Sequence, residues 1–212
     1  MGLARPAFAR VPDIGFWKLC GSGTGEGFTP APNTSVYAVL ATWPDLKTAQ
    51  QRIENNGIFS HYRAKSDENY TLYLSPISAR GAWAGVAPFQ ASSAPDNGAV
   101  AALTRATINP IDTLKFWRRV PDISDMIGQD PNVAFKIGIG EVPLLHQITF
   151  SVWPDTKVMA DFARADGPHA RAIKAVRDGN WFREELYARF RILDRRGTWG
   201  GTDPLAHLET AI

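Results

Sequence analysis

Alternating apolar and polar positions predict a mixture of strands and helices in the second half of the chain. Residues 100–108, 133–139 and 146–152 read as strands, because apolar and β-branched side chains dominate them and turn-forming residues flank them. Gly140-Glu-Val-Pro143 separates the last two, so we expect an antiparallel hairpin. Asn109 and Pro110 are typical of a helix start and predict a helix from about residue 111 to about residue 127.

A second helix is expected after Asp155, whose carboxylate can cap a helix N-terminus. Apolar side chains then recur every three or four positions from Val158 to Ala163, and a further helical stretch contains His169 and Val176. A strand at residues 189–193 completes the order β-α-β-β-α-β. This is the split βαβ unit of ferredoxin-like domains, in which one antiparallel sheet carries both helices on one face.

The first half repeats this pattern about 110 residues earlier. Arg-Val-Pro-Asp-Ile occurs at residues 10–14 and 119–123, and Trp-Pro-Asp at residues 43–45 and 153–155. The duplication predicts that both halves are copies of one structural unit.

The first copy shows strands at residues 36–42 and 70–74 and a helix at residues 46–55, but the counterpart of strand 100–108 would lie before residue 1. We therefore predict an α+β fold with tandem ferredoxin-like repeats in a fused dimeric α/β-barrel arrangement. The expected parts are a first repeat that lacks its N-terminal strand, a linker and a second repeat, at residues 1–87, 88–98 and 99–212.

Composition narrows the class of protein. The 212 residues are 44% hydrophobic and carry a formal net charge of +2 with acids and bases interspersed, so nucleic-acid binding is not expected. Cys20 is the only cysteine, which excludes an intrachain disulfide, and the N-terminus shows no signal-peptide pattern. No apolar run approaches the roughly 20 residues of a transmembrane helix. These features favour a reducing, cytoplasmic setting.

Residues 1–18 are basic, and apolar side chains such as Phe8, Phe16 and Trp17 are interleaved with the charges. This pattern predicts peripheral contact with a membrane, while an ordinary helix that faces the core is an equal alternative.

Two histidines occupy similar places in the two copies: His61 precedes Arg63, and His169 precedes Arg171. A duplicated imidazole beside a duplicated arginine could supply an axial ligand and a distal donor to haem. On spacing alone, the alternative is that each histidine caps its helix and each arginine is solvated.

The glycine-rich residues 21–27 lack the Gly-Lys-Ser/Thr ending of a phosphate-binding loop, so a flexible loop with close backbone approach is favoured. Its counterpart at residues 138–141 keeps the Gly-x-Gly-Glu pattern. Cys20 could be a thiolate ligand, but a free cysteine usually acts as a small hydrophobic side chain. Aromatic residues recur at matching positions of the two copies, which is typical of packing and also suits a polyene or a flat macrocycle.

Several long motifs resemble the spheroidene monooxygenase family, the carotenoid ketolases of purple phototrophic bacteria. They lie at residues 16–30, 41–45, 101–108 and 180–190, and the similarity extends over nearly the whole chain. What the resemblance implies is oxidation at C-2 of acyclic carotenoids such as spheroidene, with O₂, haem and a reduced ferredoxin-type donor. Two hydroxylations at one carbon would give a gem-diol that loses water to become the ketone.

The predicted architecture is also similar to haem proteins with two ferredoxin-like halves, such as dye-decolourising peroxidases and chlorite dismutases. By that analogy His169 is the axial iron ligand, His61 is its degenerate copy, and Arg171 or Arg105 polarises dioxygen. Loss of haem is then expected for His169→Ala and not for His61→Ala.

Two other functions stay open from the sequence. The first is a non-catalytic module that binds haem or a polyene. The second is a monooxygenase that uses no cofactor, which would need a substrate able to react directly with O₂.

Overall fold

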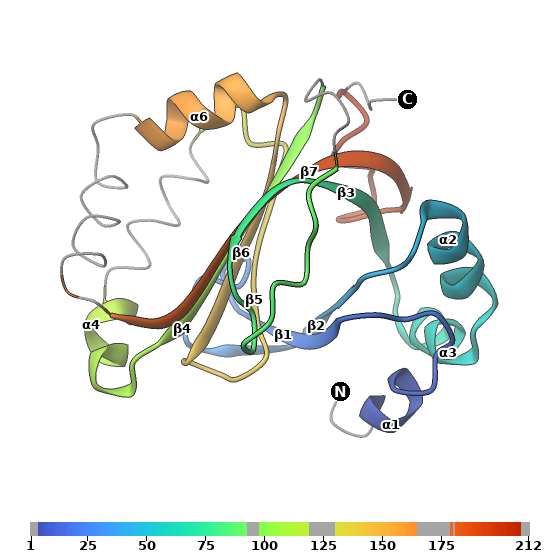
Figure 1. The fold of residues 1–212 in the computed structure, drawn as a ribbon, viewed down its shortest axis with the longest axis horizontal. Coiled ribbons are helices and arrows are strands. Elements are labelled where there is room, and N and C mark those ends of the chain that lie inside the picture. The colour runs from blue at the N-terminus through green and yellow to red at the C-terminus, as the bar shows by residue number, and fades with distance from the viewer. Residues whose placement is uncertain (1–3, 93–97, 119–129, 165–178, 180, 209–212) are drawn as a thin grey trace.

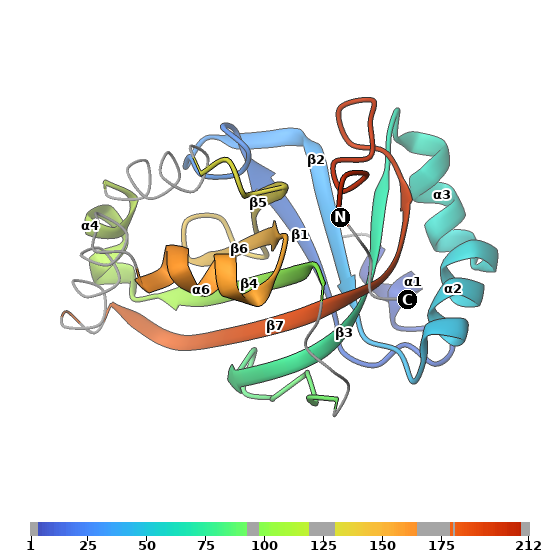
Figure 2. The same ribbon diagram turned by 90° about the horizontal axis from the view of Figure 1, so that it is seen from above.

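One antiparallel sheet organises the chain in the computed structural model, which describes residues 4–92, 98–118, 130–164, 179 and 181–208. The seven strands lie in the order β2-β1-β5-β6-β4-β7-β3, and the sheet curls strongly (Figure 1, Figure 2). The strands are β1 (Trp17–Gly23), β2 (Pro32–Ala41), β3 (Tyr70–Gly81), β4 (Val100–Ile108), β5 (Phe135–Gly140), β6 (His146–Trp153) and β7 (Phe182–Gly197).

Helices flank the sheet on two sides. The structure describes α1 (Arg5–Phe8), α2 (Leu46–Asn55), α3 (Gly57–Lys65), the 3₁₀ turn η2 (Pro110–Asp112), α4 (Thr113–Trp117) and α6 (Thr156–Arg164). In both ribbon views, α2 and α3 lie together at one side of the molecule and α4 and α6 at the other (Figure 1, Figure 2). The predicted mixture of helices and strands is therefore confirmed. None of the described helices is long and apolar enough to cross a membrane.

The second half supplies the middle of the sheet. Its four strands lie in the order β5-β6-β4-β7, and all neighbours are antiparallel. The first half supplies both edges, because β1 pairs with β5 and β3 pairs with β7. Within the described ranges β2 and β3 do not pair with each other, so the strands of the first half do not form a continuous sheet of their own. The duplicated barrel and the division at residues 88–98 stay predictions.

The repeated Trp-Pro-Asp motif has the same local structure in both halves. The Asp45 carboxylate accepts a hydrogen bond of 2.7 Å from the backbone N–H of Thr48 at the start of α2. Asp155 accepts one of 2.7 Å from the N–H of Val158 in α6. Each motif therefore lies between a strand and a helix, and its aspartate satisfies a free donor of that helix, as predicted for Asp155.

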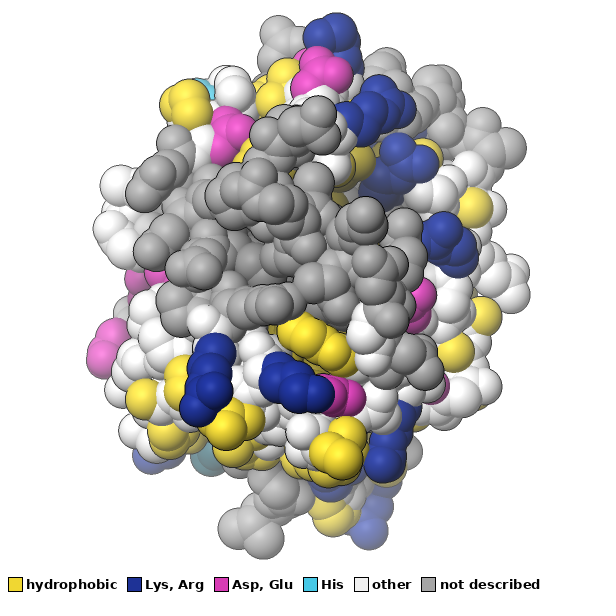
Figure 3. Space-filling view, turned by 90° about the vertical axis from the view of Figure 1, so that its left-hand side faces the viewer, with side chains coloured by type: hydrophobic (Ala, Val, Ile, Leu, Met, Phe, Trp, Pro, Cys, Tyr) yellow, Lys and Arg dark blue, Asp and Glu magenta, His cyan; other side chains and the backbone are white. Residues whose placement is uncertain are grey.

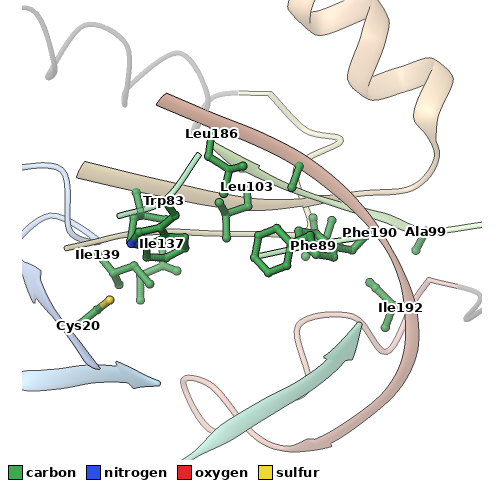
Figure 4. Packing of buried hydrophobic residues seen from close by; sticks show 14 of the residues in the cluster. Cys20, Trp83, Phe89, Ala99, Leu103, Ile137, Ile139, Leu186, Phe190 and Ile192 are labelled. Atoms are coloured by element: carbon green, nitrogen blue, oxygen red, sulfur yellow. The ribbon is translucent and has the colours of Figure 1, made fainter. Parts of the chain in front are cut away.

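Side chains of alternating strand positions build one apolar interior. The inward face carries Cys20 of β1, Leu103 of β4, Ile148 of β6 and Leu186 of β7. Figure 4 shows Trp83 close to Ile137 and Ile139, while Phe89 packs edge-on against Phe190. This interior is the core of the molecule.

Several predicted boundaries match and others are too short. The bounds of α2 and β4 agree with the predicted residues 46–55 and 100–108. In contrast, β7 has 16 residues where five were predicted, because charged residues on its outward face obscure the apolar alternation. The predicted helix 111–127 begins within η2 and α4, and residues 119–127 lie outside the described residues, as does the stretch with His169 and Val176.

The glycine-rich segment is partly a strand, which corrects the prediction of a flexible loop. Gly21 and Gly23 belong to β1, and only the residues after them turn away. The predicted close approach is confirmed at Gly27, because a Cβ atom there would lie 1.7 Å from the carbonyl oxygen of Gly138. The backbone N–H of Gly138 also donates to the carbonyl oxygen of Glu26 at 2.7 Å.

Candidate functional site

Charged side chains replace apolar ones at one end of the inward face. Lys18, Arg105 and Glu184 point to the same side of their strands as Cys20, Leu103 and Leu186. Glu141 and His146 bracket the turn between β5 and β6. Together with Trp83, these side chains form what we call the charged cluster, which consists of Lys18, Trp83, Arg105, Glu141, His146 and Glu184.

Arg105 is at the centre of the charged cluster. Its side chain is only 2% exposed, it forms an ion pair with Glu184, and one guanidinium nitrogen lies 3.8 Å from Oε2 of Glu141. The guanidinium also lies 5.6 Å from the ring centroid of Trp83, within cation–π range. Its Nε has no hydrogen-bond partner among the described residues. A guanidinium buried in this way depends on its carboxylates, because an uncompensated charge in the interior is costly.

Glu141 gathers the other polar groups of the cluster. Its Oε1 accepts a hydrogen bond of 3.0 Å from the indole N–H of Trp83 and lies 3.4 Å from the ammonium group of Lys18. Its Oε2 lies 3.2 Å from Nδ1 of His146. A carboxylate and an imidazole in contact beside a guanidinium are groups that can hold an anion or transfer a proton.

Glu184 fastens the turn that carries Trp83. Its carboxylate oxygens accept hydrogen bonds from the backbone N–H groups of Ala84, at 3.0 Å, and Gly85, at 2.7 Å. Burial opposes ionisation of Glu184, but these two hydrogen bonds and Arg105 outweigh it, so the pKa lies below its ordinary value of 4.5. The carboxylate is therefore ionised in the folded protein at neutral pH.

Cys20 lies beside the charged cluster as a neutral thiol. Its side chain is completely buried. Burial, and to a lesser degree the charge of Glu141, raise its pKa to about 12 in spite of Lys18 and Arg105. The thiol therefore packs as a small apolar side chain, which is the alternative that the sequence favoured.

The predicted haem and dioxygen residues fall in different places. Arg105 lies in the charged cluster, whereas His61 is exposed on α3. His169 and Arg171 lie outside the described residues. The structure thus does not bring His61 and Arg105 to one site, and the roles of His169 and Arg171 stay predictions.

The haem that the resemblance implies does not fit the charged cluster as it stands. Trp83 is fully covered by other atoms of the protein, and Arg105 nearly so, which leaves no room beside them for a macrocycle. No group of three or more His, Cys, Asp or Glu side chains suited to a metal ion occurs within the described ranges. The charged cluster therefore offers haem neither space nor a set of metal ligands among the described residues.

Most members of the charged cluster were not predicted as site residues from the sequence. His146, Glu141 and Glu184 look like ordinary surface residues until the register of the strands is known. The available signal was that His146 and Glu184 share the inward phase of Ile148 and Leu186, two residues further along each strand.

In the basic N-terminal segment, the apolar side chains point toward the protein interior. Phe8 is completely buried, its ring stacks on Trp17 at 5.7 Å, and Phe16 packs edge-on against Trp83. These contacts favour the interpretation in which the segment faces the core.

Three bacterial proteins are similar in sequence to this chain along most of its length. It is 51% identical to spheroidene monooxygenase of Rhodobacter capsulatus over 97% of this chain and 87% of that protein. It is also 51% identical to spheroidene monooxygenase of Cereibacter sphaeroides, over 95% of this chain but only 63% of that protein. The Rubrivivax gelatinosus protein of the same name is 35% identical over 90% of this chain and 73% of its own length.

Solved structures are only distantly similar to the chain. A proposed monooxygenase of Fusobacterium nucleatum has a TM-score of 0.46 at 9% identity, over 93% of this chain and 84% of that one. No family model matches the sequence.

Proposed function

Since this chain belongs to the spheroidene monooxygenase family, we propose that it oxidises C-2 of an acyclic carotenoid of the spheroidene type to a ketone. The observation that carries this proposal is the 51% identity over 97% of the chain to the Rhodobacter capsulatus protein. The proposed co-reactants are O₂, haem and a reduced ferredoxin-type protein.

The proposed reaction converts a CH₂ group into a carbonyl in two hydroxylations. Each takes one oxygen atom from O₂, reduces the other to water, and consumes two electrons and two protons. The second hydroxylation gives a gem-diol, which loses water to form the ketone. The electrons for both hydroxylations come from the proposed ferredoxin-type donor.

The apolar interior supports this proposal as the place for one end of the substrate. It consists of closely packed aliphatic and aromatic side chains and ends at the charged cluster. Trp83 and Phe89 fill it from the connection between β3 and β4, so the substrate must displace this connection to enter. Hydrogen exchange at residues 82–92 should then become faster when spheroidene binds, since the N–H of Trp83 donates to Val86 at 2.8 Å. Unchanged or slower exchange would place the substrate elsewhere.

The decisive experiment is turnover by purified protein. Spheroidene in detergent micelles is incubated with the protein, haem, a reduced ferredoxin and isotopically heavy O₂. The expected product has gained one heavy oxygen and lost two hydrogens, and its absorption maximum moves to longer wavelength because the carbonyl extends the conjugation. Pigment that stays bound without a change of mass would instead identify a non-catalytic binding module. Product formed without haem and donor would identify chemistry that needs no cofactor.

The haem ligand is tested separately by spectroscopy. Protein produced with ample haem should lose its Soret band in His169→Ala and keep it in His61→Ala, because His61 is exposed on α3. His146→Ala is the third variant, since the contact of His146 with Glu141 resembles the carboxylate contact of many metal-binding imidazoles. Loss of the band in His146→Ala alone would transfer the ligand role from His169 to His146.

A further inference from the structure

Aliphatic side chains project into solvent at one tip of the molecule. Ile111 in η2 is 86% exposed and Leu114 in α4 is 63% exposed. Val142 and Leu144 in the turn between β5 and β6 are exposed as well. We call these four residues the apolar tip. Large apolar side chains that are exposed as a group mark a contact surface more often than isolated ones do.

The two segments of the apolar tip are fastened to each other. The indole N–H of Trp117 in α4 donates to the carbonyl oxygen of Leu144 at 2.9 Å. The N–H of Ile108 donates to the carbonyl oxygen of Leu145 at 2.8 Å, where β4 ends beside the start of β6. The apolar tip is therefore one surface on a rigid base.

Basic side chains lie beside the η2 and α4 part of the apolar tip. Lys115 follows Leu114, Arg118 follows α4, and both are exposed. Arg183 is held beside η2 by a hydrogen bond of 3.0 Å to Asn109. The nearby acid of η2, Asp112, is itself paired with Lys115 at 3.0 Å. Figure 3 shows hydrophobic and basic side chains side by side on the lower part of this face.

We propose that the apolar tip inserts into the interface of an anionic lipid bilayer. Exposed aliphatic side chains beside basic ones match a bilayer interface, which has an apolar layer under negatively charged headgroups. A second copy of this chain is a poorer occupant, because a two-fold contact would bring the same cations against each other.

This surface lies at the same end of the sheet as the charged cluster. Glu141 and His146 flank the turn that presents Val142 and Leu144. Docking at the apolar tip would therefore bring the charged end of the interior to the membrane. Binding to lipid is independent of the proposed reaction and is measured without turnover.

Vesicle flotation tests the proposal. The full chain is mixed with phosphatidylcholine vesicles that contain or lack phosphatidylglycerol, and the bound fraction is measured. The wild type should float with the anionic vesicles, and Ile111→Asn/Leu114→Asn/Leu144→Asn should lower the partition coefficient about tenfold or more. Asparagine suits position 144 because Leu144 has a φ of +67°, a conformation that asparagine adopts readily.

The matched control is Tyr37→Asn/Val39→Asn, which removes two exposed apolar side chains from β2 and should float like the wild type. Lys115→Gln/Arg118→Gln should weaken binding to anionic vesicles only, and high salt should remove that difference. Equal flotation of the wild type and the triple variant would overturn the proposal, as would a wild type that binds no vesicles. A dimer lost in the triple variant, with unchanged flotation, would assign the apolar tip to a second copy.

Discussion

Glu184 joins two distant parts of the chain through one carboxylate. It binds the turn at Ala84 and Gly85 and compensates the charge of Arg105 in the interior. The same contacts that hold the turn also lower the pKa of Glu184. This residue therefore links the stability of the charged cluster to pH.

Stability should fall in acid partly through Glu184. Its pKa is lower in the folded chain than the ordinary value of 4.5, so the unfolded chain takes up the proton first. The stabilisation is present above about pH 4.5 and is lost as the pH falls through the folded pKa. Urea unfolding should show that Glu184→Gln costs about 1–3 kcal/mol at pH 7 and less at pH 4.

Glu185→Gln provides the control, because Glu185 is an exposed neighbour whose contact is with Tyr187. A cost for Glu184→Gln that does not change between the two pH values would show that the carboxylate does not titrate with folding.

Of the residues in the charged cluster, the sequence predicted a site role only for Arg105, and that role stays a prediction. Arg105 was singled out and does lie in the interior, but its partners Glu141 and Glu184 were not identified as such. Their roles depend on which face of each strand turns inward, and that is decided by pairing between strands far apart in the chain. The repeat that drew attention to His61 selected an exposed residue of α3.

At the level of elements, the sequence predicted helix starts reliably where a side chain caps the nearby backbone. The caps at Asp45 and Asp155 fixed the starts of α2 and α6 because each carboxylate satisfies a donor three residues away. The long strands β3 and β7 were underestimated because their length comes from tertiary pairing, which overrides local pattern.

The contact between the glycine-rich segment and β5 should tolerate no side chain at Gly27. Gly27 has a φ of +91°, and a Cβ atom there would overlap the carbonyl group of Gly138. Gly27→Ala should lower the free energy of unfolding by at least about 2 kcal/mol, measured by urea denaturation. The control is Gly21→Ala, since a Cβ atom at Gly21 has nothing within 4 Å. Similar stability of the two variants would mean that the close approach is not maintained in solution.

On the scale of the whole molecule, the duplication visible in the sequence did not reveal how the copies are joined. The strand order places the second half in the middle and strands of the first half on both edges. A repeat predicts two similar units, but the pairing of β1 with β5 and of β3 with β7 follows from edges that need partners.

The two halves should unfold together. Ala188 of β7 pairs with Leu103 of β4 on one side and with Ala79 of β3 on the other, so one strand belongs to both halves. Calorimetry of the full chain should show one transition whose calorimetric and van't Hoff enthalpies agree. Ala188→Pro should remove a ladder hydrogen bond from this central strand and unfold the entire chain, whereas two separate transitions would contradict a shared unit.

The shared strand also determines how fragments of the chain would behave. A fragment with the second half alone would expose the long edge of β7 that β3 normally covers, and would tend to aggregate along it. A fragment with the first half alone would hold β3 apart from β1 and β2, without a neighbour for it. When produced together, the fragments would offer each other these missing neighbours, so a break between residues 88 and 98 suits the protein to reassembly from two separate polypeptides.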